Sequence, residues 1–236
     1  MLARSAHLPP FILLIASLLL FATCPLANAS LEEARQDWTQ GDVNSAIIRL
    51  KNLLQEQPEN ADARLLLGRI YLESLDATAA EQQFMHAQDA GADDATTRAL
   101  LAEALLLKGD TTRALEWAQS PADATATERA EILALRGSIL VAQGKDAEAA
   151  DAFSAAFEAD PGSLRAMLGK ATLEVQRGAN DTAREIVQQA VDAYPESPDA
   201  WQALSKLEQA SGRNRAAADA LTQAISHTRT QWPLQY

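Results

Sequence analysis

The sequence predicts an all-α solenoid, a fold in which pairs of antiparallel helices stack one after another. A spacing of 34 residues runs through the chain, because Gly144, Gly178 and Gly212 are separated by it, and so are Pro161 and Pro195. Alanine recurs with the same period at Ala149, Ala183 and Ala217, and again at Ala156, Ala190 and Ala224. Self-similarity at a fixed period of roughly 20–50 residues is typical of stacked supersecondary units. Such units build surfaces for partners more often than active sites.

The period divides the chain into six expected units, each made of two helices joined by a short turn. The units are 27–60, 61–94, 95–129, 130–163, 164–197 and 198–231, and the third is one residue longer than the others. Glycine adopts a positive φ at little cost, and it stands at the turn of five units: Gly41, Gly109, Gly144, Gly178 and Gly212. The second unit has Leu75-Asp76 there instead. Ser197-Pro198 is an expected N-cap followed by proline at the first helical position.

Small residues recur at two positions of every unit, counted here from the first residue of the unit. Position 8 holds Ala34, Gly68, Ala102, Gly137, Ala171 and Ser205, and position 20 holds Ala46, Ala80, Ala114, Ala149, Ala183 and Ala217. Small side chains allow two helices to approach closely while larger residues interlock around them. Large apolar residues occupy position 24 in five of the units: Leu50, Phe84, Phe153, Val187 and Leu221.

One joint between units is irregular. Pro121 lies inside the expected second helix of the third unit, so that helix should end near Ser120 and residues 120–127 should form a loop. Two interpretations remain open for this loop: a tolerated insertion, or a hinge that changes the curvature of the array.

The N-terminus has the features of a secretion signal. Residues 11–22 are apolar apart from Ser17, a run too short for a membrane span of roughly 20 residues. Pro25 is expected to end any helix before the small-x-small sequence Ala27-Asn28-Ala29, so residues 1–29 are the expected signal peptide, removed before Ser30. An alternative is lipidation at Cys24, although Phe21 and Thr23 depart from a lipobox. An uncleaved membrane anchor is a third reading, disfavoured by the short apolar run.

Composition excludes several classes of function. The formal net charge is −12 at pH 7, which opposes nucleic acid or an anionic membrane surface as the main partner. The single cysteine lies in the N-terminal segment, so disulfides and thiolate metal sites are not expected. The three histidines lie far apart in the sequence, and no phosphate-binding glycine loop with a following Lys-Ser or Lys-Thr occurs. We therefore expect no enzyme activity, no cofactor and no metal.

The pattern of units resembles the tetratricopeptide repeat (TPR) superfamily over nearly all of the chain after the expected signal. That resemblance implies a right-handed superhelix that binds proteins. Between Glu33 and about Trp117 the chain is also similar to the opening repeats of TPR lipoproteins that accompany PEP-CTERM (exosortase) exopolysaccharide systems. The strings that carry this similarity are AIIRLKNLLQ at 46–55, PENADARLLLG at 58–68 and IYL at 70–72. Those relatives are longer and carry a clear lipobox.

In a TPR superhelix the first helix of each unit lines the concave face, chiefly through positions 2, 5, 9, 12 and 13. When these positions are transferred to each unit of this chain, the resemblance implies a protein-binding groove that consists of an apolar stripe with a charged rim. Its expected members are Arg35, Trp38, Leu65, Arg69, Leu72, Ala99, Glu103, Leu106, Val141, Leu168 and Val175, with Lys206 near the far end. The alternative is that the stripe packs against neighbouring units. TPR clamps for acidic chaperone C-termini need Lys, Asn and Arg at positions 5, 6 and 9, which this chain lacks.

These features predict an exported periplasmic scaffold that binds proteins in exopolysaccharide or cell-envelope assembly. The alternatives are a pilotin-like or outer-membrane assembly lipoprotein, anchored to a membrane through Cys24, and an adaptor or regulator of an envelope enzyme. The last unit ends near Gln231 and residues 232–236 are too few for a capping helix. We therefore expect its open face to mediate weak self-association or partner docking, unless Trp232 and Tyr236 fold back over it.

Overall fold

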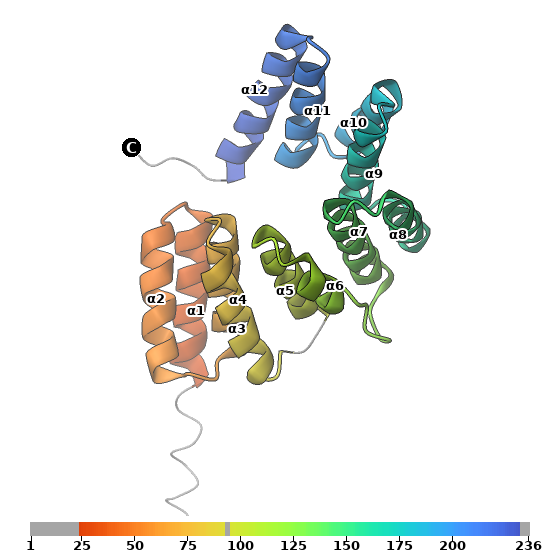
Figure 1. Ribbon diagram of the computed structural model, residues 1–236. Coiled ribbons are helices and arrows are strands. Elements are labelled where there is room, and N and C mark those ends of the chain that lie inside the picture. Colours follow the sequence, from red (N-terminus) through yellow and green to blue (C-terminus); the bar gives the residue numbers. More distant parts are fainter. Residues whose placement is uncertain (1–23, 93–94, 232–236) are drawn as a thin grey trace, which may run out of the picture.

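The computed structural model describes residues 24–92 and 95–231, and its helices follow one another along a curved path (Figure 1). This part of the chain contains twelve helices and no strand. The helices are α1 (Cys24–Thr39), α2 (Val43–Glu56), α3 (Ala61–Glu73), α4 (Ala77–Asp89), α5 (Ala95–Leu107), α6 (Thr111–Trp117), α7 (Ala126–Ala142), α8 (Asp146–Ala159), α9 (Leu164–Gln176), α10 (Asn180–Ala193), α11 (Pro198–Ala210) and α12 (Asn214–Gln231). The predicted all-α solenoid is confirmed.

Each expected unit contains one pair of these helices, which we call helix A and helix B. Helix A packs against helix B within the pair, and helix B packs against helix A of the next pair. Successive A helices also contact one another, as α5 contacts α7 and α7 contacts α9. Because the A helices approach one another in this way, the array bends toward them and they line its inner side.

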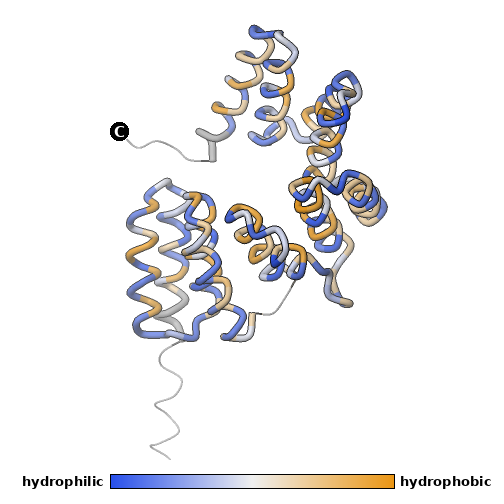
Figure 2. The backbone as a smooth tube through the Cα atoms, viewed as in Figure 1, coloured by the Kyte–Doolittle hydropathy of each residue, from blue (hydrophilic) through white to orange (hydrophobic). Residues whose placement is uncertain are grey.

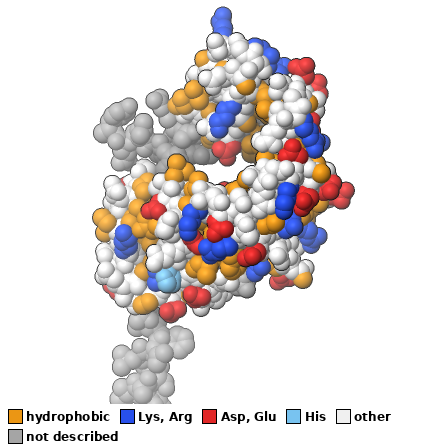
Figure 3. All heavy atoms as spheres, in the orientation of Figure 1, with side chains coloured by type: hydrophobic (Ala, Val, Ile, Leu, Met, Phe, Trp, Pro, Cys, Tyr) orange, Lys and Arg blue, Asp and Glu red, His pale blue; other side chains and the backbone are white. Residues whose placement is uncertain are grey.

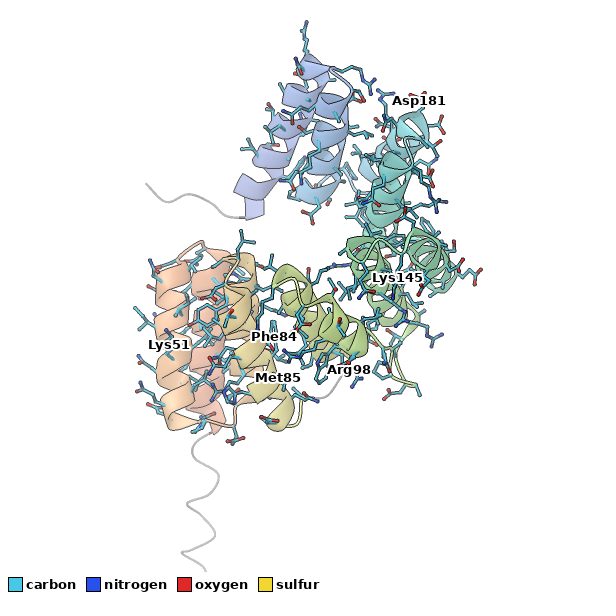
Figure 4. All side chains as sticks on the ribbon, in the orientation of Figure 1. Lys51, Phe84, Met85, Arg98, Lys145 and Asp181 are labelled. Carbon is cyan, nitrogen blue, oxygen red and sulfur yellow. The ribbon has the colours of Figure 1, made fainter. Side chains whose placement is uncertain are left out.

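The small residues at positions 8 and 20 are all buried, as the sequence predicted. Four of the five large residues at position 24, Leu50, Phe84, Phe153 and Val187, fill the space between helices, whereas Leu221 of the last unit is exposed. Phe84 lies among α3, α4 and α5 (Figure 4). Apolar segments of the helices accordingly face neighbouring helices, while polar segments face outward (Figure 2). The core is therefore a row of small clusters, each shared by adjacent helix pairs.

The turn between helix A and helix B needs one residue in the left-handed region. The five predicted turn glycines have φ between 72° at Gly144 and 84° at Gly41. In the second unit Leu75 stands at this position with a φ of 61°, and its side chain is 74% exposed. Leucine therefore occupies a backbone conformation that costs a non-glycine residue about 1–2 kcal/mol.

The irregular joint differs in detail from the prediction. Helix α6 ends at Trp117 rather than near Ser120, and α7 begins at Ala126, so Thr127 is helical and the loop is residues 118–125. A capping box starts α7 early: the Thr125 side chain accepts from the backbone N–H of Glu128, whose carboxylate accepts from the backbone N–H of Thr125. The sequence Thr125-x-x-Glu128 carries this signal, which the sequence analysis overlooked.

The N-terminal segment also requires a correction. The described part of α1 starts at Cys24 and contains Pro25, so the chain is helical through Ala27-Asn28-Ala29 and this proline does not leave the expected cleavage site outside a helix. Residues 1–23 of the expected signal peptide and the expected tail, residues 232–236, lie outside the described residues. Burial in the described part of α1 begins with Leu31, after the expected cleavage site.

Candidate protein-binding groove

A groove of about 830 Å³ lies on the inner side of the C-terminal half of the array. We call it the inner groove. Its residues come from α5, α7, α9 and α11, four consecutive A helices, with Val187 of α10 at its base. The lining residues are Glu103, Glu131, Ser138, Leu164, Arg165, Leu168, Gly169, Ala171, Thr172, Val175, Val187, Asp199, Gln202, Ala203, Lys206, Leu207 and Ala210.

Arg165 forms the centre of an ion trio in this groove. Its Nε lies 3.1 Å from Glu131 Oε2, and its Nη2 lies 3.2 Å from Glu103 Oε1. Ser163, the N-cap of α9, donates its hydroxyl to Glu131 Oε1 at 3.4 Å. The trio joins A helices of three successive units, so it fixes their relative positions as well as the charge of the groove.

The two carboxylates keep the arginine charged. Burial lowers the pKa of the Arg165 guanidinium, but the charges of Glu103 and Glu131 and their hydrogen bonds outweigh it, so the pKa lies above its usual value. The Nη1 group of Arg165 is not used by either carboxylate in these contacts. A planar guanidinium held on two edges can still donate to a bound carbonyl or carboxylate.

The rest of the groove is apolar with a polar rim. Leu168 and Val175 lie on the same face of α9, about two turns apart, and Val175 is 39% exposed. The hydroxyls of Ser138 and Thr172 donate to the carbonyls of Ala134 and Leu168, which leaves their oxygens free to accept. Lys206 forms no ion pair among the described side chains, and its ammonium lies 3.5 Å from the amide oxygen of Gln202. The groove thus offers apolar contact, donors and acceptors along one line.

The Tetratricopeptide repeat family model matches residues 38–96 and 140–207, which together make up more than half of the chain. The chain belongs to the tetratricopeptide repeat family. TPR arrays are scaffolds for protein–protein interaction. No curated protein gives a significant match to the chain.

Solved TPR structures share the fold at low identity. PilW, a widely conserved type IV pilus biogenesis factor, matches with a TM-score of 0.65 and 18% identity over 89% of this chain and 96% of PilW. PilF of Pseudomonas aeruginosa matches with a TM-score of 0.61 and 15% identity over 89% of this chain and 93% of PilF. YrrB, a TPR protein with an unusual peptide-binding site, has a TM-score of 0.53 and 20% identity over 79% of this chain and 93% of YrrB. These likenesses show the fold.

The structure brings four of the predicted groove residues together. Glu103, Leu168, Val175 and Lys206 line the inner groove. Most of the predicted apolar stripe is only half exposed, because its members also pack against neighbouring helices. Those half-buried members are Trp38, Leu65, Leu72, Ala99, Leu106 and Val141.

The N-terminal part of the predicted stripe forms a separate polar cluster. The indole N–H of Trp38 donates to Glu73 Oε2 at 3.0 Å. Burial raises the pKa of the Glu73 carboxyl above its usual value. The hydrogen bond from Trp38 and the charge of Arg69 lower the pKa, but burial outweighs them. Arg69 is exposed, and the exposed Arg35 is ion-paired with Glu32 at 2.8 Å. These residues are not part of the inner groove.

The sequence analysis did not single out Arg165, the central residue of the groove. Arg165 stands at position 2 of its unit, one of the concave positions that the TPR resemblance implies, so its place in the groove could have been predicted. Its pairing with Glu103 could not be predicted from the sequence, because the two residues are 62 positions apart and meet only through the curvature of the array.

The described residues contain no cluster of histidine, cysteine, aspartate or glutamate placed to hold a metal ion. His86 lies on α4 and His227 on α12, and neither lines the inner groove. None of the helices in the described ranges has the length and apolar character needed to cross a membrane.

Proposed function

We propose that the protein is an exported scaffold of the cell envelope that holds an extended segment of a partner protein in the inner groove. The observation that carries this proposal is the groove itself. It combines an apolar floor with hydrogen-bonding groups supplied by four consecutive A helices. A segment lying along it can place side chains against Leu168 and Val175 while its backbone meets Ser138, Thr172 and Arg165.

The charges of the groove suit a segment of mixed polarity. Glu103 and Glu131 are engaged by Arg165, so the groups that remain for a partner are the free edge of Arg165, the ammonium of Lys206 and the carboxylate of Asp199. Figure 3 shows basic and acidic side chains lying beside one another on the visible face of the middle units. A strongly acidic or strongly basic partner would leave like charges facing each other.

Export is supported by the sequence of residues 1–29 and by the position of the core. Among the residues of α1 whose side chains the structure describes, 29–39, the first buried ones are Leu31 and Ala34, so both lie after the expected cleavage site. The intact mass of the secreted form tests this. A mass that begins at Ser30 is expected, and a mass that begins at Cys24 with a diacylglycerol and an acyl chain would place the protein on a membrane instead.

The partner proposed for this scaffold belongs to exopolysaccharide or envelope assembly, and the support for it is the sequence resemblance described for residues 33–117. A second candidate is a role in type IV pilus biogenesis. It is favoured by the matches to PilW and PilF, which extend over 89% of this chain.

Site-specific photo-crosslinking in cells tests the groove and separates the two candidates. A photoreactive residue at Val175 or Lys206 is expected to capture one envelope protein, whereas the same residue at Glu148, exposed on α8, is not. Capture of an exopolysaccharide-assembly component supports the first candidate, and capture of a pilus component supports the second. Equal capture from Glu148 would contradict binding in the groove.

A further inference from the structure

The last helix exposes two large apolar residues at positions that the inner units bury. Leu221 and Ile225 of α12 are 44% and 47% exposed, and they stand at positions 24 and 28 of the sixth unit. Position 24 is at most 3% exposed in the other units that carry a large residue there: Leu50, Phe84, Phe153 and Val187. At position 28, Leu54 and Val191 are buried. The exposure of Leu221 and Ile225 is therefore specific to the end of the array.

The structure also shows what covers these positions in the inner units. Ala63, Leu66, Leu67 and Ile70 of α3 share one buried cluster with Leu50, Leu53 and Leu54 of α2. In the same way Ala200, Leu204 and Leu207 of α11 share a cluster with Val187 and Val191 of α10. Each covering helix therefore supplies a small residue at position 3 and large apolar residues at positions 7 and 10. Among the described residues no helix covers α12 in this manner.

From Asn214 to Ile225 the open face of α12 carries no charged residue. Helical spacing places Asn214, Ala218, Leu221, Thr222 and Ile225 on one side of the helix. Figure 3 shows apolar side chains on the side of α12 that faces away from α11. Depletion of charge around exposed large apolar residues is typical of the core of a protein interface.

The opposite end of the array does not fit this face. The exposed residues of α1 after Ala29 are polar: Glu32, Glu33, Arg35, Gln36 and Thr39. A second copy stacked head to tail would place these charged and amide groups on Leu221 and Ile225. This mismatch opposes an open-ended chain of copies.

We propose that the open face of α12 binds an amphipathic helix of a partner protein, in the place where helix A of a further unit would pack. The required pattern follows from the internal interfaces. It is a small residue followed by large apolar residues four and seven positions later, as in Ala63, Leu67 and Ile70. This surface lies outside the inner groove, and the proposal does not depend on the function proposed for that groove.

A peptide with the sequence of residues 60–74 is a suitable probe, because it contains α3 together with its cap Asn60. Saturable binding of the labelled peptide to the purified protein is expected by fluorescence anisotropy. Leu221→Glu should weaken it by at least about tenfold, while Ile48→Glu, at a residue of α2 that is 59% exposed, should leave it unchanged. A peptide carrying Leu67→Asp and Ile70→Asp should not bind. Absence of saturable binding, or equal binding by Leu221→Glu, would overturn the proposal.

Two further measurements identify other occupants of the face. A dimer seen by sedimentation velocity of the purified protein, and dissociated by Leu221→Glu, would assign the face to a second copy. Deletion of residues 232–236 that raises peptide affinity would assign it to the chain's own C-terminal segment. Either result would overturn a partner helix as the occupant. Circular dichroism checks that Leu221→Glu remains folded, and Ile225→Glu replaces it if it does not.

Discussion

Phe84 occupies the space that a side chain on residue 68 would need. A Cβ atom built on Gly68 would lie 2.4 Å from Cε1 of Phe84, closer than nonbonded carbon atoms approach. The fourth unit repeats this relationship, with 2.5 Å between a Cβ on Gly137 and Cε1 of Phe153. Position 8 is glycine in both of the units that have phenylalanine at position 24. The side chains at positions 8 and 24 of a unit therefore occupy one shared volume, and a larger one at either position requires a smaller one at the other.

The first prediction concerns this shared volume. Gly68→Ala should lower the free energy of unfolding by about 1–3 kcal/mol, because the added methyl group overfills a packed site. Phe84→Leu alone should also be destabilising. The double variant should lose less stability than the sum of the two single variants, because alanine and leucine already pack together at these positions in the first unit, as Ala34 and Leu50. Urea unfolding of the four proteins measures the coupling, and simple additivity would contradict a shared volume.

The second prediction concerns the left-handed residue Leu75. Leu75→Gly should stabilise the protein by roughly 0.5–1 kcal/mol, since relief of the unfavourable φ exceeds the added entropy of the unfolded chain. Leu75→Ala keeps the strained conformation and serves as the control. Thermal unfolding distinguishes the two variants, because only Leu75→Gly is expected to have a higher unfolding midpoint than the wild type. Equal midpoints for both variants would show that exposure of the leucine side chain matters more than its backbone.

The third prediction concerns the N-cap of α10. Asp42, Asp76 and Asp110 are the N-caps of the first three B helices, and the side chain of each accepts a hydrogen bond from the backbone N–H three residues later. The N-cap of α10 is Ala179, which makes no side-chain hydrogen bond. Its φ of −85° and ψ of 57° are close to the φ of −83° and ψ of 69° of Asp110. Because the backbone is already in the capping conformation, Ala179→Asp should stabilise the protein by about 1 kcal/mol. Ala179→Ser should give part of the gain, and no gain from either would contradict the prediction.

The fourth prediction concerns the buried carboxylate of Glu208, whose residue is only 2% exposed. Arg184 Nε lies 2.6 Å from its Oε1, and Arg213 donates to its Oε2. The hydrogen bond from Arg213 is the largest cause that lowers the pKa of Glu208; burial opposes it, and Arg184 adds to it. The lowered pKa gives stability that is complete above the unfolded pKa of about 4.3. That stability is lost as the pH falls through the folded pKa.

Glu208→Gln should therefore reduce the free energy of unfolding by about 2 kcal/mol at pH 7, since two charge-assisted hydrogen bonds are weakened. The difference from the wild type should shrink as the pH is lowered below about 4. Unfolding curves at pH 7, 5 and 3 test this. Glu158→Gln, at an exposed position of α8, is the matched control and should change nothing. A difference that stays constant over this pH range would contradict the prediction.

The fold could be predicted from the sequence because its packing positions recur. Each unit repeats the same small and large residues, so helix pairing, turns and core followed from the 34-residue spacing. Local cap chemistry decides details that the period does not contain. The capping box of Thr125 and Glu128 starts α7 before the expected unit boundary, and the segment Ala27-Asn28-Ala29 that follows Pro25 is helical.

The candidate groove was predicted only in part. Glu103, Leu168 and Val175 could be placed because concave positions are fixed within each unit. The ion trio of Arg165, Glu103 and Glu131 could not, because it depends on how sharply the array bends between the third and fifth units. The same bend brings A helices together, which is why residues such as Leu72 and Leu106 are half buried rather than freely presented.

The last prediction separates binding from packing in the groove. Val175→Asp should reduce crosslinking of the groove partner at least about tenfold with little change in melting temperature, because Val175 is 39% exposed and a charge there stays hydrated. Leu72→Asp should instead lower the melting temperature, because Leu72 packs against the cluster that contains Phe84. Thr182→Asp, exposed on α10, is the control for added charge and should change neither measurement. Crosslinking is read from a photoreactive residue at Lys206, and melting from circular dichroism. If Val175→Asp captured the partner as well as Thr182→Asp does, the apolar floor of the groove would have no part in binding.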